Sequence, residues 1–353
     1  MRDFNYCKLK DNLWSNDILN YCAIIHEYKG KQEYFIRQKP QELERLVEIA
    51  KVQSTEASNE IEGIRTSSTR LKQICKDKTT PRNRAEEGIA GYRDVLNVVH
   101  ENFDYIQITP NYILQMHKIM YGHQSSNIGG KFKSVQNYIN ATDERGNSRT
   151  IFTPLAPYET AEAMAMICAE FNRAVAENAV DPLILIPIFI HDFLCIHPFI
   201  DGNGRMSRLL TTLLLYKCGY SIGKYISLES KIPKHKDLYY DALAQSQYGW
   251  NENKDNPEAF IKYLLGTIIS AYRDFEERFN ILNGGIEDGK AKSVDMVKRA
   301  IDSIIGKFNK AKIMELCPSL SVSTIESALR KLVAQKEIEK QGIGKSTFYI
   351  RIK

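Results

Sequence analysis

The sequence predicts a mainly α-helical protein with one β-hairpin and a small α+β domain at its C-terminal end. Apolar residues recur at helical spacing along most of the chain, for example in residues 86–103. Between residues 126 and 155 this period gives way to loose alternation around a turn, which favours a hairpin. Residues 283–290, NGGIEDGK, have the composition of a linker. We therefore expect a helical body that carries the hairpin, followed by a separate domain.

The composition is that of a globular protein with room for two or three domains. The chain has 353 residues, and 43% of them are hydrophobic. Its seven cysteines include no CxxC pair, which favours reduced thiols over disulfides or a zinc site. The N-terminus lacks the apolar segment of a signal peptide, and the longest apolar run, 183–196, is too short to span a bilayer. We expect a cytoplasmic protein without a membrane segment.

Charge is distributed unevenly along the chain. Residues 290–353 contain 14 Lys or Arg and 6 Asp or Glu, whereas the preceding residues contain 34 and 37. A basic segment on a near-neutral body indicates a separate module, and its charge favours an acidic partner. The expected organisation is an N-terminal helical region at 1–105, a core at 106–282, a linker at 283–290 and a small domain at 291–353.

The N-terminal region is expected to hold an arm with short helices in residues 1–40 and another helix from about Pro40. Farther along, Ser58 and Glu62 are four residues apart and share one helix face, and Gly63 is suited to a left-handed turn that ends the helix. Taken alone, this pattern predicts a short capped helix, about residues 54–63, with a solvated glutamate. The other helices of the body are expected at 86–103, 112–121, 158–177, 183–196, 209–216, 238–247 and 257–282.

The hairpin is expected within about residues 127–153. Residues 127–139 alternate loosely, residues 143–147 form a turn, and residues 149–152 return before Pro154. Two histidines of the flanking helices, His117 and His191, have no metal-like partners in the sequence, so we expect them to be packing residues.

The densest group of chemically active residues is HPFIDGNGRMSR, residues 197–208. It lies between two apolar helices, on a loop that enters a helix N-terminus, which is a natural anion site. Gly202 and Gly204 let the main chain approach phosphate oxygens, and Asn203 adds an amide donor. Two guanidinium groups three residues apart, Arg205 and Arg208, can clamp phosphate from one side. The pattern predicts a polyphosphate site rather than a structural turn with surface arginines.

Two further groups of this motif suit catalysis. Asp201 is a hard oxygen ligand where Mg²⁺ would bridge phosphates. His197, at the end of the preceding helix, can accept a proton near neutral pH. The motif is similar to the signature of the Fic (filamentation induced by cAMP) family, HxFx[DE]GNGRxxR, with every defined position filled. The resemblance implies a Fic-type helical bundle with a β-hairpin flap and a protein adenylyltransferase, which moves AMP from ATP to a Ser, Thr or Tyr hydroxyl of a target protein or of itself.

The resemblance also implies a role for each residue. His197 would deprotonate the acceptor hydroxyl, Asp201 would hold Mg²⁺, and Phe199 would anchor the loop. The residues that would contact the phosphates of ATP are Gly202, Asn203, Gly204, Arg205 and Arg208. The residues that would lie near the rest of the nucleotide are Tyr138 and Ile139 of the flap and Tyr239, Tyr240 and Gln247 of a later helix; core packing is the alternative for the two tyrosines. The flap would dock the target segment by strand addition.

Residues 58–63, SNEIEG, are similar to the family's inhibitory motif [ST]xxxE[GN]. The resemblance implies that Glu62, flanked by Ser58 and Gly63, pairs with Arg208 and blocks the position of the γ-phosphate. The physics is consistent with this role, because a carboxylate competes with phosphate for a partly desolvated guanidinium. The motif leaves two alternatives open. One is removal of AMP, with Glu62 positioning water, and the other is transfer of another phosphate-bearing group.

The C-terminal segment is expected to fold as three helices and two strands. The helices are expected at 294–305, at 310–316 and from Ser323 to about Gln335. The third helix would begin with a capping box formed by residues 323–326, STIE. The strands are expected at 338–341 and 347–352. This order resembles a winged-helix domain. Its charge suggests DNA binding, but the exposed face of its third helix offers only Arg330, Lys331 and Gln335. Protein docking and homodimerisation therefore stay open, as does a DNA-binding regulator whose Fic domain senses nucleotide.

Overall fold

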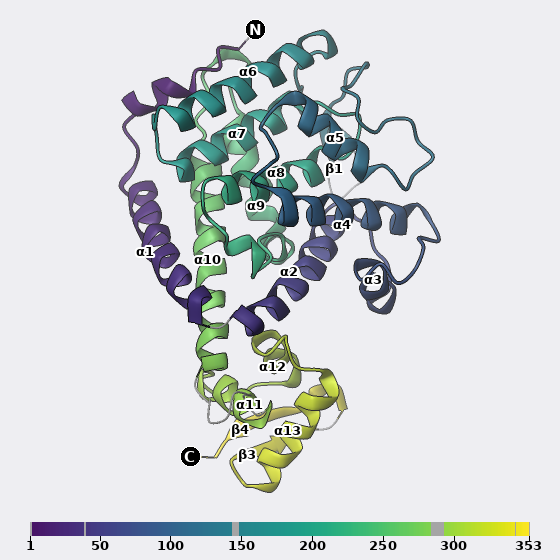
Figure 1. Cartoon of the computed structure of the whole chain (residues 1–353), viewed down its shortest axis with the longest axis vertical. Helices are drawn as coiled ribbons and strands as arrows, with labels where there is room; N and C mark the ends of the chain where they lie inside the picture. The colour runs from purple at the N-terminus through teal and green to yellow at the C-terminus, as the bar shows by residue number, and fades with distance from the viewer. Residues whose placement is uncertain (1, 39, 143–147, 284–292, 343, 353) are drawn as a thin grey trace.

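Two nearly completely buried helices form the centre of the structure. They are α7 (Pro182–Ile196) and α8 (Asn203–Lys217), and 13 of the 15 residues of each are buried. Helices that are buried on all sides must be surrounded by other elements. The computed structural model describes residues 2–38, 40–142, 148–283, 293–342 and 344–352, and in this part of the chain the body is helical apart from one hairpin, as predicted (Figure 1).

The other helices of the body pack around this pair. α6 packs on α7, α4 on α8, and α9 and α10 close the remaining side, while α1 lies along α10. The elements are α1 (Asn16–Gln38), α2 (Pro40–Ile61), α3 (Ser68–Cys75), α4 (Arg84–Asn102), α5 (Pro110–Met120), α6 (Pro157–Ala176), α9 (Lys236–Gln247) and α10 (Glu258–Asn283).

The N-terminal arm differs from the prediction. A short 3₁₀ helix, Tyr6–Asp11, precedes the single 23-residue helix α1, where short helices were expected. Ile18, Cys22 and Ile25 are buried at helical spacing, but charged residues and tyrosines between them hide the pattern in the sequence. The predicted short helix at 54–63 is the last part of α2, and Gly63 follows it with φ of +76°.

The hairpin consists of β1 (Ile139–Thr142) paired antiparallel with β2 (Ser148–Phe152). The predicted return strand is confirmed, whereas the position of the first strand was wrong because residues 127–138 form turns and irregular backbone. Here Gly129 and Gly130 pack against Lys118 of α5, so this segment is used for packing rather than for a strand ladder. The predicted turn, 143–147, lies outside the described residues.

The C-terminal elements follow the predicted order of three helices and two antiparallel strands. They are α11 (Ser293–Asp302), α12 (Lys310–Leu316), α13 (Val322–Ala334), β3 (Ile338–Gln341) and β4 (Phe348–Arg351). The cap of α13 was misassigned, because Ser321 rather than Ser323 accepts the hydrogen bond from the Thr324 N–H. Asn283 belongs to α10, and the rest of the predicted linker lies outside the described residues.

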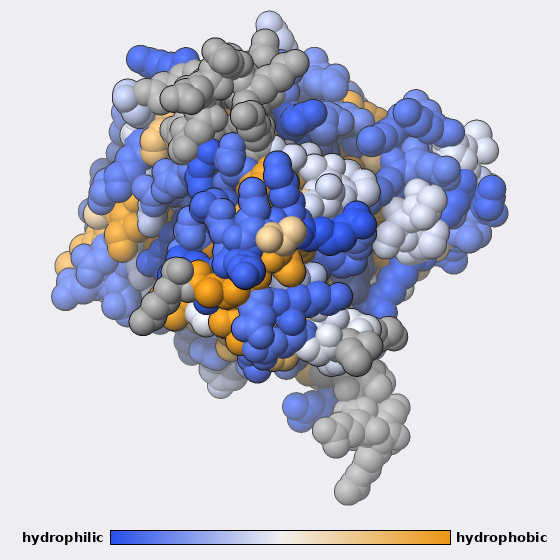
Figure 2. Space-filling view, turned by 90° about the horizontal axis from the view of Figure 1, so that it is seen from below, coloured by the Kyte–Doolittle hydropathy of each residue, from blue (hydrophilic) through white to orange (hydrophobic). Residues whose placement is uncertain are grey.

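These C-terminal elements gather at the lower end of α10 in Figure 1. Lys234 of the body contacts Glu315 of α12 there, with 3.3 Å between Nζ and Oε1. Seen from this end, the surface is mostly hydrophilic with small hydrophobic areas near its centre (Figure 2). Among the described residues, no helix is long and apolar enough to cross a bilayer. All seven cysteines lie in the described part of the chain and are free thiols.

Candidate functional site

The chain reverses between α7 and α8 through a loop that begins at His197 and ends at Gly202. Both residues have left-handed backbones, with φ of +52° for His197 and +85° for Gly202. A Cβ at Gly202 would lie 2.6 Å from Cε of Met120, so this turn requires glycine. The first turn of α8 then points its free N–H groups into the space above the loop.

Buried side chains brace the loop. Phe199 is fully buried and stacks on His117, with ring centroids 3.7 Å apart, which agrees with the predicted anchoring and packing roles. The Gly130 N–H donates to Nδ1 of His117, so Nε2 carries the proton that is donated to the Asp201 carbonyl at 3.1 Å. The amide of Asn203 donates to the Phe199 carbonyl at 2.7 Å and accepts from the Phe199 N–H at 2.9 Å. Because this side chain holds the loop, a contribution of Asn203 to phosphate binding would come from its backbone N–H.

His197 is set up as a neutral base. Its Nδ1 lies 3.2 Å from the Leu194 carbonyl, so the Nδ1–H donates there and Nε2 keeps a free lone pair. Burial lowers the pKa of His197 to about 4, which exceeds the opposing effect of the bond to Leu194. The imidazole is therefore unprotonated at neutral pH and can accept a proton.

A pocket of about 240 Å³ lies above the loop. It brings together most of the predicted site residues, which are Glu62, Ile139, His197, Asp201, Gly202, Asn203, Gly204, Arg208, Tyr239, Tyr240 and Gln247. Residues that the sequence reasoning missed complete the lining, namely Ile151, His191, Leu194, Cys195, Ile200, Leu243 and Ala244. Helical spacing could have found Leu243 and Ala244, because they lie three and four residues after Tyr240 on the same face of α9.

Four predicted site residues do not line this pocket: Ser58, Gly63, Tyr138 and Arg205. The side chain of Arg205 is 3% exposed, and its Nη2 donates to the Tyr121 hydroxyl at 2.9 Å. The expectation that both arginines of the motif face one side of the site is therefore wrong for this structure. Burial is the reason, because α8 is covered on the side of Arg205 by Gly88 of α4.

Glu62 lies at the pocket as the partner of Arg208. Its Oε1 accepts from Nη2 of Arg208 at 2.7 Å. Ser58 adds two contacts to the same guanidinium, since its hydroxyl accepts from Nε at 2.8 Å and its carbonyl from Nη2 at 2.9 Å. Burial is the largest single effect and disfavours the charge of Arg208, but Glu62, Tyr239 and Tyr92 together raise the pKa of Arg208. Ser58 of α2 and the following Glu62 thus occupy the hydrogen-bond donors of Arg208.

Asp201 is the residue that fits a magnesium ion. Its side chain is 54% exposed; one oxygen accepts from the Gly202 N–H at 2.7 Å, and the other faces the pocket side 3.7 Å from Nη2 of Arg205, a contact that a bound cation would replace. Among the described residues no cluster of three His, Cys, Asp or Glu could form a complete metal site. One carboxylate is nevertheless what Mg²⁺ uses when phosphates and water supply its other ligands.

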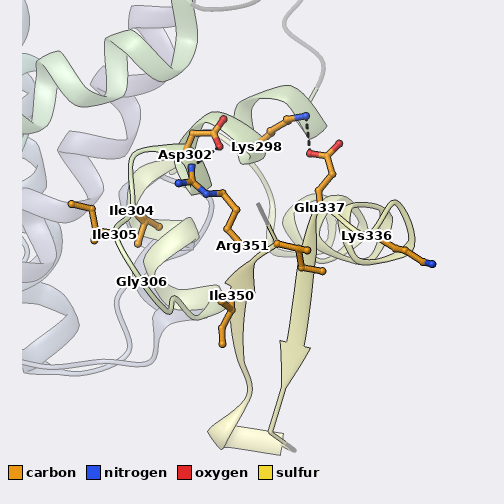
Figure 3. A pocket seen from close by; sticks show the side chains of 10 residues that line it. Lys298, Asp302, Ile304, Ile305, Gly306, Lys336, Glu337, Ile350 and Arg351 are labelled. Carbon is orange, nitrogen blue, oxygen red and sulfur yellow. Dashed lines mark hydrogen bonds and ion pairs between the residues drawn. The ribbon is translucent and has the colours of Figure 1, made fainter.

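A larger hollow, about 710 Å³, lies in the C-terminal domain (Figure 3). Two ion pairs border it, Lys298 with Glu337 at 2.7 Å and Arg351 with Asp302 at 3.2 Å. Four of its five charged side chains are thus paired with one another, and Lys336 points away from the hollow (Figure 3). Because the smaller pocket collects a base, a helix N-terminus and a guanidinium, it is the candidate active site.

Comparisons with known proteins agree with this choice. The model of the Fic/DOC family matches residues 107–215. A Fido domain-containing protein of Dictyostelium discoideum is 31% identical over 121 residues, which are 34% of this chain and 80% of that protein. A protein adenylyltransferase, fic-1 of Caenorhabditis briggsae, is 30% identical over 178 residues, 50% of this chain and 32% of that protein.

The fold has a counterpart among solved structures. The crystal structure of a Fic family protein from Desulfovibrio desulfuricans covers 97% of each chain with a TM-score of 0.63 at 18% identity. At this identity the likeness concerns the fold. The chain spans about a third or less of the length of the curated adenylyltransferases that it matches.

Proposed function

This chain belongs to the Fic/DOC family, and we propose that it is a protein adenylyltransferase that moves AMP from ATP to a hydroxyl of a target protein or of itself. The observation that carries the proposal is the pocket in which the neutral base His197 faces the N-terminus of α8 and Arg208. A base, an anion site and a guanidinium together are the groups that transfer of a phosphorus-centred group requires.

ATP would bind with its phosphates at the first turn of α8. The N–H groups of this turn and the guanidinium of Arg208 supply donors to phosphate oxygens. Tyr239, Tyr240 and Gln247 of α9 line the other part of the pocket and would receive the adenine. Asp201 would hold Mg²⁺, which neutralises part of the charge of the phosphates when it is bound.

The proposed reaction is a displacement at the α-phosphorus. Nε2 of His197 takes the proton of the acceptor hydroxyl, whose oxygen forms the new bond to phosphorus as the bond to the β-phosphate oxygen breaks. AMP remains on the acceptor, and pyrophosphate leaves. Catalysis would come mainly from positioning and from stabilisation of charge. His197→Ala should abolish transfer while ATP still binds.

Glu62 would inhibit the enzyme in its resting state. This is supported by its bond to Arg208 and by its position over Gly204, where a Cβ would collide with Oε1 of Glu62. A carboxylate there competes with phosphate for the same donors. The hairpin would present the target segment, and Ile151, which is 44% exposed and lines the pocket, is placed to contact it.

The C-terminal domain would recruit a DNA or protein partner. Its basic surplus favours an acidic surface, and phosphate contacts would weaken as salt rises. A gel-shift titration at two salt concentrations tests the DNA alternative, since an affinity that does not depend on salt would exclude phosphate contacts.

The decisive experiment is the incorporation of label from α-labelled and γ-labelled ATP into protein, for the wild type and Glu62→Gly. Label from the α position alone, increased in the variant, is the expected result. Label from the γ position would mean that the protein transfers the terminal phosphoryl group of ATP rather than AMP. No label despite bound nucleotide would favour hydrolysis or a regulatory role instead.

A further inference from the structure

The segment between α5 and β1 holds four successive backbone carbonyls of the catalytic loop. Each carbonyl accepts a hydrogen bond from Lys133 or Asn137: Ile196 from Lys133 Nζ at 2.9 Å, His197 from Asn137 Nδ2 at 3.1 Å, Pro198 from the Lys133 N–H at 2.8 Å, and Phe199 from Asn137 Nδ2 at 2.9 Å. Two residues therefore bond every backbone carbonyl from Ile196 to Phe199.

Lys133 is an unusual residue for such a position. It is 3% exposed, and no carboxylate of the described residues forms an ion pair with it. Its ammonium lies at the C-terminal end of α7, where unpaired carbonyls and the negative end of the helix dipole stabilise a cation. Burial still lowers the pKa of Lys133 to about 8. A buried cation without a counter-ion is costly, so its contacts need a reason.

Lys133 also orients Asn137. Its Nζ donates to Oδ1 of Asn137 at 2.9 Å, which leaves Nδ2 of Asn137 directed at the loop carbonyls. An amide can rotate by half a turn and exchange its oxygen and nitrogen, and only the hydrogen-bond partners select one orientation. The ammonium, which can only donate, selects the orientation with nitrogen toward the loop.

The loop needs this support at His197. His197 is not glycine, yet its φ is +52°. Such a backbone conformation is costly, and a residue keeps it only where neighbouring contacts hold it in place. The carbonyls on both sides of His197 and its own carbonyl are those that Lys133 and Asn137 hold. Neither of the two side chains lines the pocket, so they act through the loop.

We propose that Lys133 and Asn137 are positioning residues that hold His197 in its left-handed conformation and so direct its imidazole into the pocket. The inference rests on the proposed function, in which His197 is the base. If these contacts are removed, the rate of the chemical step should fall, because misplacement of a catalytic group by about 1 Å lowers the rate about 100-fold.

The test compares Lys133→Met with Lys131→Met, both in the Glu62→Gly protein. Methionine keeps the length and removes the donors of Lys133, whereas Lys131 is exposed and bonds only Asn127 among the described residues. We expect kcat for AMP transfer to fall about 100-fold in Lys133→Met, with KM for ATP changed less than about twofold. Lys131→Met should match its parent.

Nuclear magnetic resonance of the His197 imidazole gives a readout that does not need activity. The charge of Lys133 lowers the pKa of His197, so Lys133→Met should raise it and shift the imidazole resonances. An unchanged kcat and unchanged resonances would overturn the proposal, and so would a loss of kcat that is matched by loss of ATP binding and of thermal stability. If Lys133→Met does not fold, Asn137→Ser is judged by kcat and by KM for ATP alone, because the charge of Lys133 remains, and an unchanged kcat would overturn the proposal. A Glu62→Gly parent without AMP transfer would refute the proposed function, while the resonances would still decide the role of Lys133.

Discussion

The carboxylate of Glu62 lies over Gly204, in the space that a Cβ at that position would occupy, and from there it bonds Arg208. The absence of a side chain at Gly204 is what lets an acceptor oxygen approach the first turn of α8. A phosphate oxygen would use the same approach and the same guanidinium. The carboxylate and the phosphate therefore exclude each other from this site.

Removing the carboxylate should release the site. In Glu62→Gly we expect AMP transfer to rise at least ~10-fold, because a competing charge-assisted bond worth about 1.5–3 kcal/mol is lost from Arg208. Labelled AMP on protein measures the change. Glu60→Gly is the matched control, since Glu60 lies in the last turn of α2, two residues before Glu62, and pairs with Arg65 instead. An equal gain in both variants would point to loosening of α2 rather than to a specific contact.

A methyl group at position 204 should cancel that gain. Gly204→Ala, added to Glu62→Gly, places a Cβ where the carboxylate lay and where phosphate would bind. We expect the double variant to bind ATP at least ~10-fold more weakly than Glu62→Gly, in line with the loss of one charge-assisted bond. Calorimetry measures the affinity. Undiminished binding would show that phosphate does not approach α8 over Gly204.

Ser58→Ala should cost stability and weaken inhibition together. The Ser58 hydroxyl is fully buried and accepts from Nε of Arg208, so its loss leaves a buried donor unpaired. We expect the free energy of unfolding to fall by about 1–3 kcal/mol, as measured by urea denaturation. AMP transfer should rise less than in Glu62→Gly, because the carboxylate contact remains. A variant as stable as the wild type would mean that water replaces the hydroxyl.

Acid should destabilise the fold before its carboxylates titrate. Burial lowers the pKa of four histidines: His100 to about 3, and His117, His191 and His197 to about 4. Each stays neutral in the folded state while the unfolded chain binds a proton below about pH 6.5. The stability that they contribute is thus complete above that pH and is lost as the pH falls toward 4, by at most about 1.4 kcal/mol per pH unit for each histidine.

Urea midpoints at pH 7 and pH 5 measure this loss. His100→Gln removes one titrating group, so the urea midpoint of this variant should fall less between pH 7 and pH 5 than that of the wild type. Equal stability at both pH values would show that the histidines gain protons in the folded state at little cost.

Local chemistry made much of this molecule predictable. From α4 to α10, the helices of the body appear where apolar periodicity placed them, since a buried helix face needs that spacing. Gly63 adopts the left-handed turn that was expected from its place after Glu62. The loop from His197 to Gly202 joins two helices, as the flanking apolar runs indicated. Each of these predictions depended on residues close together in the sequence.

Contacts between distant segments account for what the sequence did not reveal. The first strand of the hairpin was placed too early, because residues 127–138 serve as packing for α5 and as support for the catalytic loop. The spacing of Arg205 and Arg208 allowed a shared face but could not tell that α4 and Tyr121 cover Arg205. Lys133 carries no local pattern at all, and only the folded chain brings it to Ile196.

The bond between Glu62 and Arg208 joins two segments of one chain, 146 residues apart. An inhibitor held in this way has an effective concentration that dilution does not change, in contrast to a separate inhibitory subunit. Under the proposed function, a triphosphate would have to displace this tethered carboxylate, and its apparent affinity would be reduced in proportion to the fraction of molecules in which the site is open. Under the proposed function, the packing of α2 therefore sets the fraction of open molecules, and a partner that shifts this fraction would change the rate of AMP transfer gradually.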